Sequence, residues 1–292
     1  MAKVRELRKR IKSVRNTKKI TKTMEMVATA KFKRALDRVK AAKPYAAEVS
    51  ALLASCATAA SLEAAAHPLV RAGAEGAPDG VLIFTANRGL CGGFNSNMIK
   101  RGRALLEEVR ASLGRSALSV VGKKGIGIFR FEGVPIARRY TQFEDKPGFA
   151  EARAVSRDFI EDFRTGRIRS LRLAYTSFRS AGEQKPVVVP VLPVPIDSLP
   201  GAGTGKGMPP LTSPAPGGLL ERLVPLWLSL QFYRALVESA ACEQVARRVA
   251  MKAATDNADE MIKSLSRDAN RARQSQITQE IAEIVGGTEA IQ

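Results

Sequence analysis

Apolar and small side chains recur at alternating spacings of three and four over the N-terminal part of the chain. The positions are Val4, Leu7, Ile11, Val14, Ala28, Phe32, Ala35, Val39, Ala42, Ala46, Val49 and Leu53. This spacing places them on one stripe of a long helix and is typical of a helix packed against another in a coiled coil. Pro44 lacks an amide donor, so we expect it to kink this helix or to end its first segment.

The stripe changes phase in the middle of this helix. Three polar residues occupy the positions expected to face the partner helix, and three apolar residues stand one position earlier: Lys18, Thr21 and Glu25, and Ile20, Met24 and Val27. A slip of this kind swings the apolar stripe around the helix. We therefore expect Met24 to be exposed beside Lys18, Lys19 and Lys22, and the alternative is that it is buried in the coiled coil.

A second helix with the same spacing is predicted near the C-terminus. Its positions are Leu226, Leu230, Tyr233, Val237, Ala240, Met251, Ala254, Ala258, Met261 and Leu265. Two such stripes at opposite ends of a chain can bury each other by pairing, so we predict an antiparallel coiled coil. After Leu265 the same phase meets mostly polar residues, so the helix is expected to continue alone until Gly286 and Gly287 end it.

The predicted lone end of the second helix regains apolar character. Its large aliphatic residues are Ile277, Ile281, Ile284 and Val285. Because no partner helix remains within the chain at this point, we expect another chain to cover this apolar tip.

Between the two helices, short apolar runs alternate with helical patterns. Strands are predicted over 81–86, 118–122, 171–178 and 187–196, and helices over 95–113 and 150–164. Because 187–196 contains three prolines, it can only be an edge strand or an extended segment. The predicted fold class is α/β with long helices, in which an antiparallel N- and C-terminal helical coiled coil joins a central doubly wound, Rossmann-like α/β domain.

The expected division of the chain follows from these patterns. Residues 1–60 form the N-terminal helix, 78–198 the central α/β domain, 199–218 a linker rich in proline and glycine, and 219–292 the C-terminal helix with its tip.

Charge is distributed unevenly along the 292 residues. The chain has 47 Lys+Arg against 28 Asp+Glu, a formal net charge of +19, and the first fifty residues are strongly basic while the last seventy-odd are balanced. A strongly basic helix is attracted to acidic surfaces, which can be nucleic acid, anionic lipid or protein. A nucleic-acid-binding coiled coil is therefore an alternative, although it does not explain why the second stripe lies at the far terminus.

The sequence offers little that resembles an active site. The segment GLCGGFN (89–95) follows a predicted strand and GKKGIG (122–127) resembles it, but neither is a dinucleotide fingerprint or a P-loop, and we read both as tight turns. His67 is the only histidine, and Cys56, Cys91 and Cys242 form no C-x-x-C pair. We expect no catalytic, cofactor-binding or metal site, and an anion-binding α/β enzyme remains a third interpretation.

The chain also carries no signal for export or for membrane insertion. No run of about 18 uncharged apolar residues is present, and the N-terminus lacks the apolar segment and cleavage site of a secretory signal. An odd number of cysteines without a C-x-x-C pair favours a reducing compartment.

Four segments, which together reach both ends of the chain, resemble segments that occur in the same order in a known family. They are RIKSVRNTKKITKTMEMVATAKF (10–32), RGLCGGFN (88–95), RVAMKAATDNA (248–258) and RARQSQITQEIAEIVGGTEA (271–290). The sequence resembles the gamma subunits of rotary, proton-translocating ATP synthases of the bacterial type. It departs from the family pattern at LTSPAP (211–216), where many members have a Tyr-Glu-Pro motif, and at Asn87, where Asp is commoner.

The resemblance implies a function and a set of partners. The chain would be the central shaft, present in one copy, and would transmit rotation of a membrane ring of c subunits to a hexamer of alpha and beta subunits. It would also hold an epsilon subunit and lie at the cytoplasmic face of the bacterial inner membrane. Positions of the rotor-to-beta interface match Met24, Arg247, Arg273, Gln274 and Thr278.

Overall fold

The computed structural model describes residues 2–143, 146–199 and 215–289. The chain forms two units, which we call the end unit, Met1–Thr29 with Arg247–Gln292, and the sheet unit, Ala30–Ala246. Two long helices, α1 (Ala2–Ala59) and α6 (Pro216–Glu289), contribute to both units. Within the described ranges, no helix combines the length and the apolarity that crossing a membrane requires.

The remaining elements all belong to the sheet unit. They are α2 (Ser61–Ala66), β1 (Asp79–Phe84), α3 (Phe94–Leu113), β2 (Ser116–Val121), α4 (Lys123–Phe131), β3 (Ile136–Tyr140), α5 (Phe149–Arg164), β4 (Ser170–Phe178), β5 (Gln184–Leu192) and the short 3-10 helix η1 (Ile196–Ser198). Each of the predicted strands and helices of the middle region has a counterpart among them.

The five strands form one sheet in the order β3-β2-β1-β4-β5. The first four are parallel, and β5 pairs antiparallel with β4 at the edge. Pro186 and Pro190 lie in this edge strand. Proline has no N–H to donate, and an edge strand tolerates this because it pairs with a neighbour on one side only. The predicted edge strand is confirmed for 187–192, whereas 193–196 lie beyond the end of β5.

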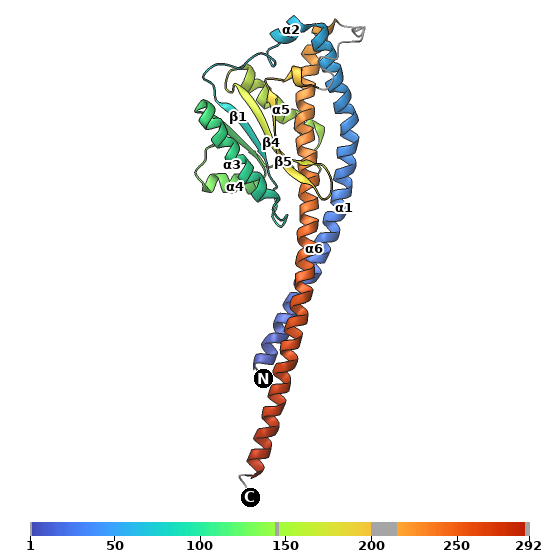
Figure 1. The fold of residues 1–292 in the computed structure, drawn as a ribbon, viewed down its shortest axis with the longest axis vertical. Coiled ribbons are helices and arrows are strands. Elements are labelled where there is room, and N and C mark those ends of the chain that lie inside the picture. The colour runs from blue at the N-terminus through green and yellow to red at the C-terminus, as the bar shows by residue number, and fades with distance from the viewer. Residues whose placement is uncertain (1, 144–145, 200–214, 290–292) are drawn as a thin grey trace. The chain divides into compact units, whose positions relative to one another are not determined.

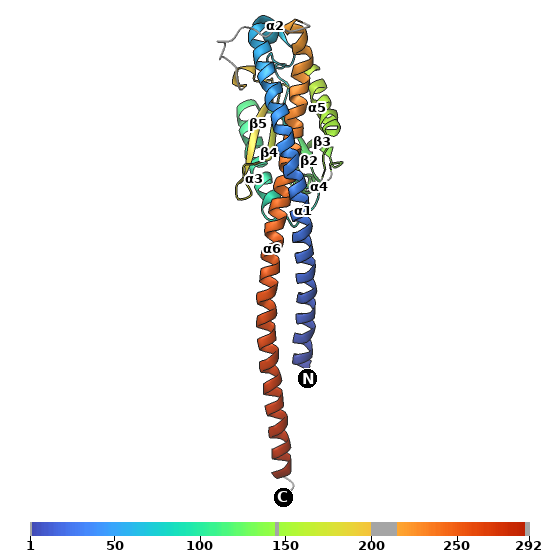
Figure 2. The ribbon, with the colours of Figure 1, turned by 90° about the vertical axis from the view of Figure 1, so that its right-hand side faces the viewer.

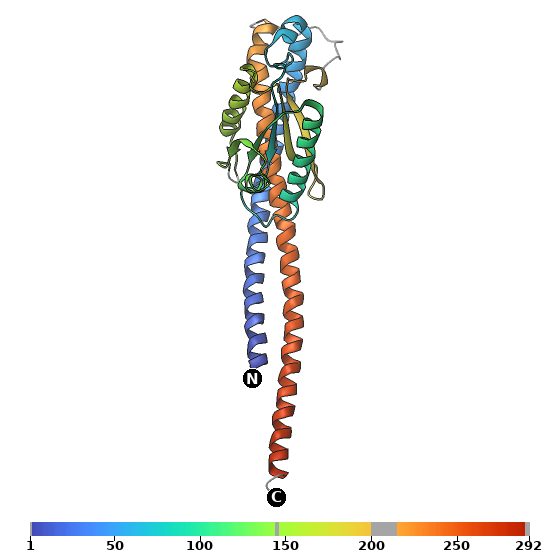
Figure 3. The same ribbon diagram turned by 90° about the vertical axis from the view of Figure 1, so that its left-hand side faces the viewer.

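Helices cover both faces of the sheet (Figure 3). Side chains alternate along β1, so Val81 and Ile83 pack with α3 and α4, whereas Leu82 and Phe84 pack with α5, α1 and α6. This period of two lets one strand serve two apolar cores. The central domain is thus doubly wound, as predicted.

The two long helices run antiparallel. In the end unit, Lys18 pairs with Asp259 and Thr21 with Thr255, so a step forward in α1 is a step backward in α6. In the sheet unit, the Trp227 indole donates to Ser50, and Val39 packs with Val237 (Figure 2). Long N- and C-terminal helices beside a doubly wound sheet confirm the predicted fold class.

Several local predictions were wrong. Of the two outcomes expected at Pro44, a kink or a helix end, the second is wrong, because Pro44 lies inside α1. Gly286 and Gly287 do not end α6, which continues to Glu289, since glycine weakens a helix without removing an amide donor. GKKGIG is not a turn throughout, because α4 begins at Lys123.

The apolar stripe of α6 also departs from the predicted phase. Met261 is exposed, whereas Ile262 is half-buried and Ala269 is buried. The stripe thus shifts by one residue after Ala258, and pairing with α1 continues past Leu265. Residues 216–218 of the expected linker belong to α6, and 200–214 lie outside the described residues.

Candidate functional site

The end unit is a helix pair whose seam is partly polar. Buried small or aliphatic residues alternate with a buried threonine pair, in which the Thr21 and Thr255 hydroxyl oxygens are 2.8 Å apart. The Lys18 ammonium donates to the Asp259 carboxylate beside it. Polar residues fill the seam from Lys18 to Glu25, so apolar residues of α1 are left outside it.

The displaced apolar residues of α1 are largely exposed. Ile20 is 60% exposed and Val27 48% exposed. Met24, which lies between them on the same helical face, is half-buried. We call this face, Ile20 with Met24 and Val27, the α1 stripe. The sequence pattern predicted the phase slip, and the half-buried Met24 lies between the two expected outcomes, exposed beside the lysines or buried in the coiled coil.

The other predicted interface residues are spread along α6. Arg247 is buried, whereas Arg273, Gln274 and Thr278 are exposed. Thr278 donates its hydroxyl to the Gln274 carbonyl oxygen at 3.0 Å. Because Thr255 lies opposite Thr21, Met24 is level with residues near 252, which is about 30 Å from Arg273 at 1.5 Å per residue. The five residues therefore form an extended surface and not one compact site.

The apolar tip is exposed as well. Ile277, Ile281 and Ile284 are 45%, 56% and 69% exposed and share one face of α6 by their spacing of four and three. The side chain of Val285 lies outside the described residues. In the end unit, α6 extends beyond the first residues of α1 (Figures 1 and 2). Exposed aliphatic residues that gather on one face of a helix are typical of a surface that another chain covers.

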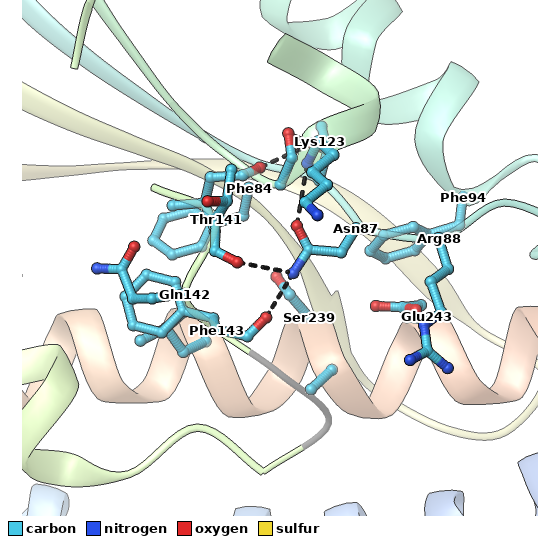
Figure 4. A pocket seen from close by; sticks show the side chains of 15 residues that line it. Phe84, Asn87, Arg88, Phe94, Lys123, Thr141, Gln142, Phe143, Ser239 and Glu243 are labelled. Atoms are coloured by element: carbon cyan, nitrogen blue, oxygen red, sulfur yellow. Dashed lines mark hydrogen bonds between the residues drawn. The ribbon is translucent and has the colours of Figure 1, made fainter. Parts of the chain in front are cut away.

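A cavity of about 300 Å³ lies at the carboxyl ends of β1 and β2, against α6. Doubly wound folds commonly bind ligands at this edge of the sheet. Figure 4 shows Asn87 at its centre, with Arg88 and Lys123 at its border. The Asn87 side-chain amide donates to the carbonyl oxygens of Thr141 at 3.2 Å and Phe143 at 2.6 Å, and its oxygen accepts from the Lys123 N–H at 3.1 Å.

The backbone amides that could face a phosphate at α4 already have partners within the chain. Besides Lys123, the Lys124 N–H donates to the Ala86 carbonyl at 3.1 Å, and the Gly125 N–H donates to the Thr85 hydroxyl at 3.0 Å. A phosphate held at a helix N-terminus needs such donors free. These hydrogen bonds instead join the segment that follows β1 to the start of α4.

The glycine-rich loop before α3 packs against the long helix. Leu90 and Gly92 have φ values of 60° and 53°, which turn the chain tightly. The turn buries Cys91 and Phe94 against Cys242 of α6. The loop thus fixes the carboxyl end of the sheet to α6, in agreement with the structural interpretation of its glycines.

Glu238 is a second link between the sheet and α6 that the sequence analysis did not identify. It is 1% exposed, and its carboxylate accepts from the Phe178 N–H at 3.1 Å and from Arg234 Nε at 2.7 Å. Burial, with the nearby Glu238 carboxylate, raises the pKa of Tyr175 to about 12. The i, i+4 spacing of Arg234 and Glu238 within an apolar stretch was the available signal.

Comparison with known proteins places this geometry in a family. Residues 3–291 match the family described as ATP synthase. The ATP synthase gamma chain of Leptospira biflexa is 44% identical over 291 residues, and that of Gemmatimonas aurantiaca is 45% identical over 293 residues, with 100% of both chains covered in each case.

Solved structures share the fold. A chain of the Euglena gracilis mitochondrial ATP synthase (OSCP/F1/c-ring) has a TM-score of 0.68 at 17% identity, covering 99% of this chain and 95% of that one. A central stalk/c-ring structure from Tetrahymena thermophila has a TM-score of 0.57 at 23% identity, covering 80% and 99%. The full-length sequence match, together with the paired terminal helices and the doubly wound middle, shows that the chain belongs to the ATP synthase gamma-chain family.

Proposed function

We propose that the chain is the central rotor shaft of a proton-translocating ATP synthase. It would transmit rotation of a membrane ring of c subunits to a catalytic hexamer of alpha and beta subunits, and so couple proton flow to ATP synthesis. The observation that carries the proposal is the end unit, a helix pair with an exposed apolar α1 stripe and an exposed apolar tip, in a chain that matches gamma chains over its full length.

The end unit suits a shaft mechanically and chemically. An antiparallel helix pair resists twisting, and the Lys18–Asp259 and Thr21–Thr255 contacts fix the register of the two helices. Because the α1 stripe lies on one side of the pair, rotation would present it to each beta subunit in turn. Each beta subunit would then shift between open and closed states according to which face it meets.

In this proposal the chain itself converts no nucleotide. The amides at the start of α4 are used within the sheet unit, which supports a structural role for the sheet edge. We further propose that one copy serves each complex, that the sheet unit holds an epsilon subunit, and that the complex lies at the cytoplasmic face of the bacterial inner membrane. The nucleic-acid alternative finds no support in the comparisons.

Co-purification tests the proposal directly. The chain is given an affinity tag, expressed in its source organism and purified. Alpha and beta subunits should be recovered at three copies each per copy of the chain. When membranes are solubilised gently, c subunits should be recovered as well. Recovery of the chain without alpha and beta subunits would refute the proposed function. Salt-resistant recovery of nucleic acid in their place would favour the alternative.

A further inference from the structure

A groove of about 720 Å³ separates α5 from the first turns of α6 within the sheet unit. Its floor is apolar and includes Ile160, Pro225 and Leu226. The sides carry four arginines, Arg153, Arg157 and Arg164 from α5 and Arg222 from α6. We call this feature the arginine groove.

The walls of the arginine groove are fixed by a buried contact between the two helices. The hydroxyl oxygens of Ser156 and Ser229 are 2.8 Å apart, and the Ser229 hydroxyl also lies 2.9 Å from the Pro225 carbonyl oxygen. Two small side chains at the crossing let α5 and α6 approach closely. The groove is therefore preformed, and a partner would need little rearrangement to enter it.

The charges of the groove are not neutralised within the chain. All four arginines are exposed, and among the described residues none has a carboxylate within ion-pair distance. Glu161 and Glu221 also line the groove and are likewise unpaired there. Four cations against two anions leave a net positive groove, and guanidinium groups bind carboxylates in a bidentate manner.

We propose that the arginine groove docks a segment of a partner polypeptide in which acidic side chains flank an apolar one. The acidic side chains would pair with Arg153, Arg157 or Arg164, and the apolar one would cover Ile160 and Leu226. A flat anionic membrane fits less well, because it cannot reach a recessed apolar floor, and Glu161 and Glu221 would repel it. Interspersed charges of both signs instead select a partner with a matching pattern.

This inference rests on the proposed function only in requiring that the chain be part of an assembly. The test uses the complex purified through a tag on a beta subunit. Arg157→Lys places an amine in the groove, and a carbodiimide then joins amines to carboxylates in direct contact. Arg110→Lys on α3, exposed and in the same unit, is the matched control.

The expected result is a bond from position 157 to an Asp or Glu of another subunit, identified by mass spectrometry, with no such bond from position 110. Bonds only to Glu161 or Glu221, no bond at all, or equal bonding from both positions would overturn the proposal. If the chain is absent from the purified complex, the proposed function fails; if it is present without the bond, only this inference fails.

Charge reversal provides an independent measurement. Arg153→Glu with Arg157→Glu should weaken retention of the bonded subunit at least tenfold in a salt wash, whereas Arg110→Glu should leave it unchanged. Thermal unfolding of the purified variants checks that both fold. If the double variant instead loses binding to phosphatidylglycerol vesicles while every subunit is retained, the groove faces lipid and the polypeptide proposal is wrong.

Discussion

The hydroxyl groups of Thr21 and Thr255 meet inside the helix pair at an oxygen-to-oxygen distance of 2.8 Å, and both side chains are buried. Each hydroxyl also has an acceptor on its own helix, the Lys18 carbonyl at 3.0 Å and the Met251 carbonyl at 2.8 Å. When one hydroxyl donates its proton across the seam, the other donates its own proton to the carbonyl on its own helix. This polar contact lies where coiled coils usually carry aliphatic residues, and it favours one register of α1 against α6.

The threonine pair should behave as a coupled unit. Thr21→Val or Thr255→Val alone should lower the free energy of unfolding by about 0.5–1.5 kcal/mol, because the remaining hydroxyl loses its partner across the seam. The double variant should cost less than the sum by at least ~0.5 kcal/mol, since two methyl groups then face each other. Urea unfolding of the four proteins measures the cycle, and strict additivity would contradict a direct bond.

Met24→Lys should impair coupling more than folding. Met24 is half-buried, so a lysine there can extend its ammonium group to water at little cost in stability. A new cation on the α1 stripe would bind acidic groups of the surrounding subunits and hinder rotation. The measurement is ATP formed per proton translocated in reconstituted complex, with Met26→Lys, at a 57% exposed position on another side of α1, as the control. An unchanged yield for Met24→Lys would refute the prediction.

Loss of the apolar tip should affect assembly and not the stability of the isolated chain. Deletion of residues 277–292 removes Ile277, Ile281 and Ile284, which bury little surface within the chain. The melting temperature of the purified chain should therefore change little, while the yield of complex with alpha and beta subunits should fall. Ile281→Ser with Ile284→Ser keeps the length and should show the same split. A large drop in melting temperature would mean that the tip packs on its own chain.

How far the sequence predicts this molecule depends on the kind of signal. The seam of α1, the seam of α6 as far as Ala258 and the strands at 81–86 and 171–178 were predictable, because long periodic patterns and buried strands leave few alternatives. The helix α4 was missed because Gly122, Gly125 and Gly127 suggest a turn. Gly125 instead serves close packing, since a Cβ there would lie 2.6 Å from the Thr85 hydroxyl oxygen. That close approach is a tertiary contact, which no local pattern encodes.

The candidate site was predictable only in part. The phase slip identified the α1 stripe, and the aliphatic spacing identified the tip. The exposure of Ile20 compared with Met24 depends on which residues of α6 lie opposite them. The buried role of Glu238 depends on the Phe178 N–H at the end of β4. Such pairings join positions far apart in the chain, so no local pattern in the sequence specifies them.

Asn87→Asp should destabilise the sheet unit by about 1 kcal/mol. The substitution removes both side-chain donors to the Thr141 and Phe143 carbonyls, each bond contributing about 0.5–1.5 kcal/mol. A carboxylate near the N-terminus of α4 would regain about 0.3–1 kcal/mol, which is too little to compensate. Chemical denaturation measures the difference. Asn97→Asp, at an exposed position in the first turns of α3, should be neutral or slightly stabilising, and equal behaviour of both variants would rule out the proposed donor role.

The single histidine should make stability depend on pH between about 7 and 5. His67 is 5% exposed, and its Nδ1 accepts from the Leu69 N–H at 3.2 Å. Its Nε2 is buried and has no hydrogen-bond partner among the described residues. Burial lowers the pKa of His67, with Arg164 adding to the effect and Glu221 opposing it. The unfolded chain therefore binds the proton more readily than the folded chain, so the stabilising contribution is present above the unfolded pKa of about 6.5 and is lost as pH falls. His67→Gln keeps an acceptor for the Leu69 N–H and cannot titrate. The free energy of unfolding of this variant and of the unmodified chain is measured in urea at each pH. Between pH 7 and pH 5 it should fall less for the variant than for the unmodified chain. Parallel curves for the two proteins would show that His67 is not the titrating group.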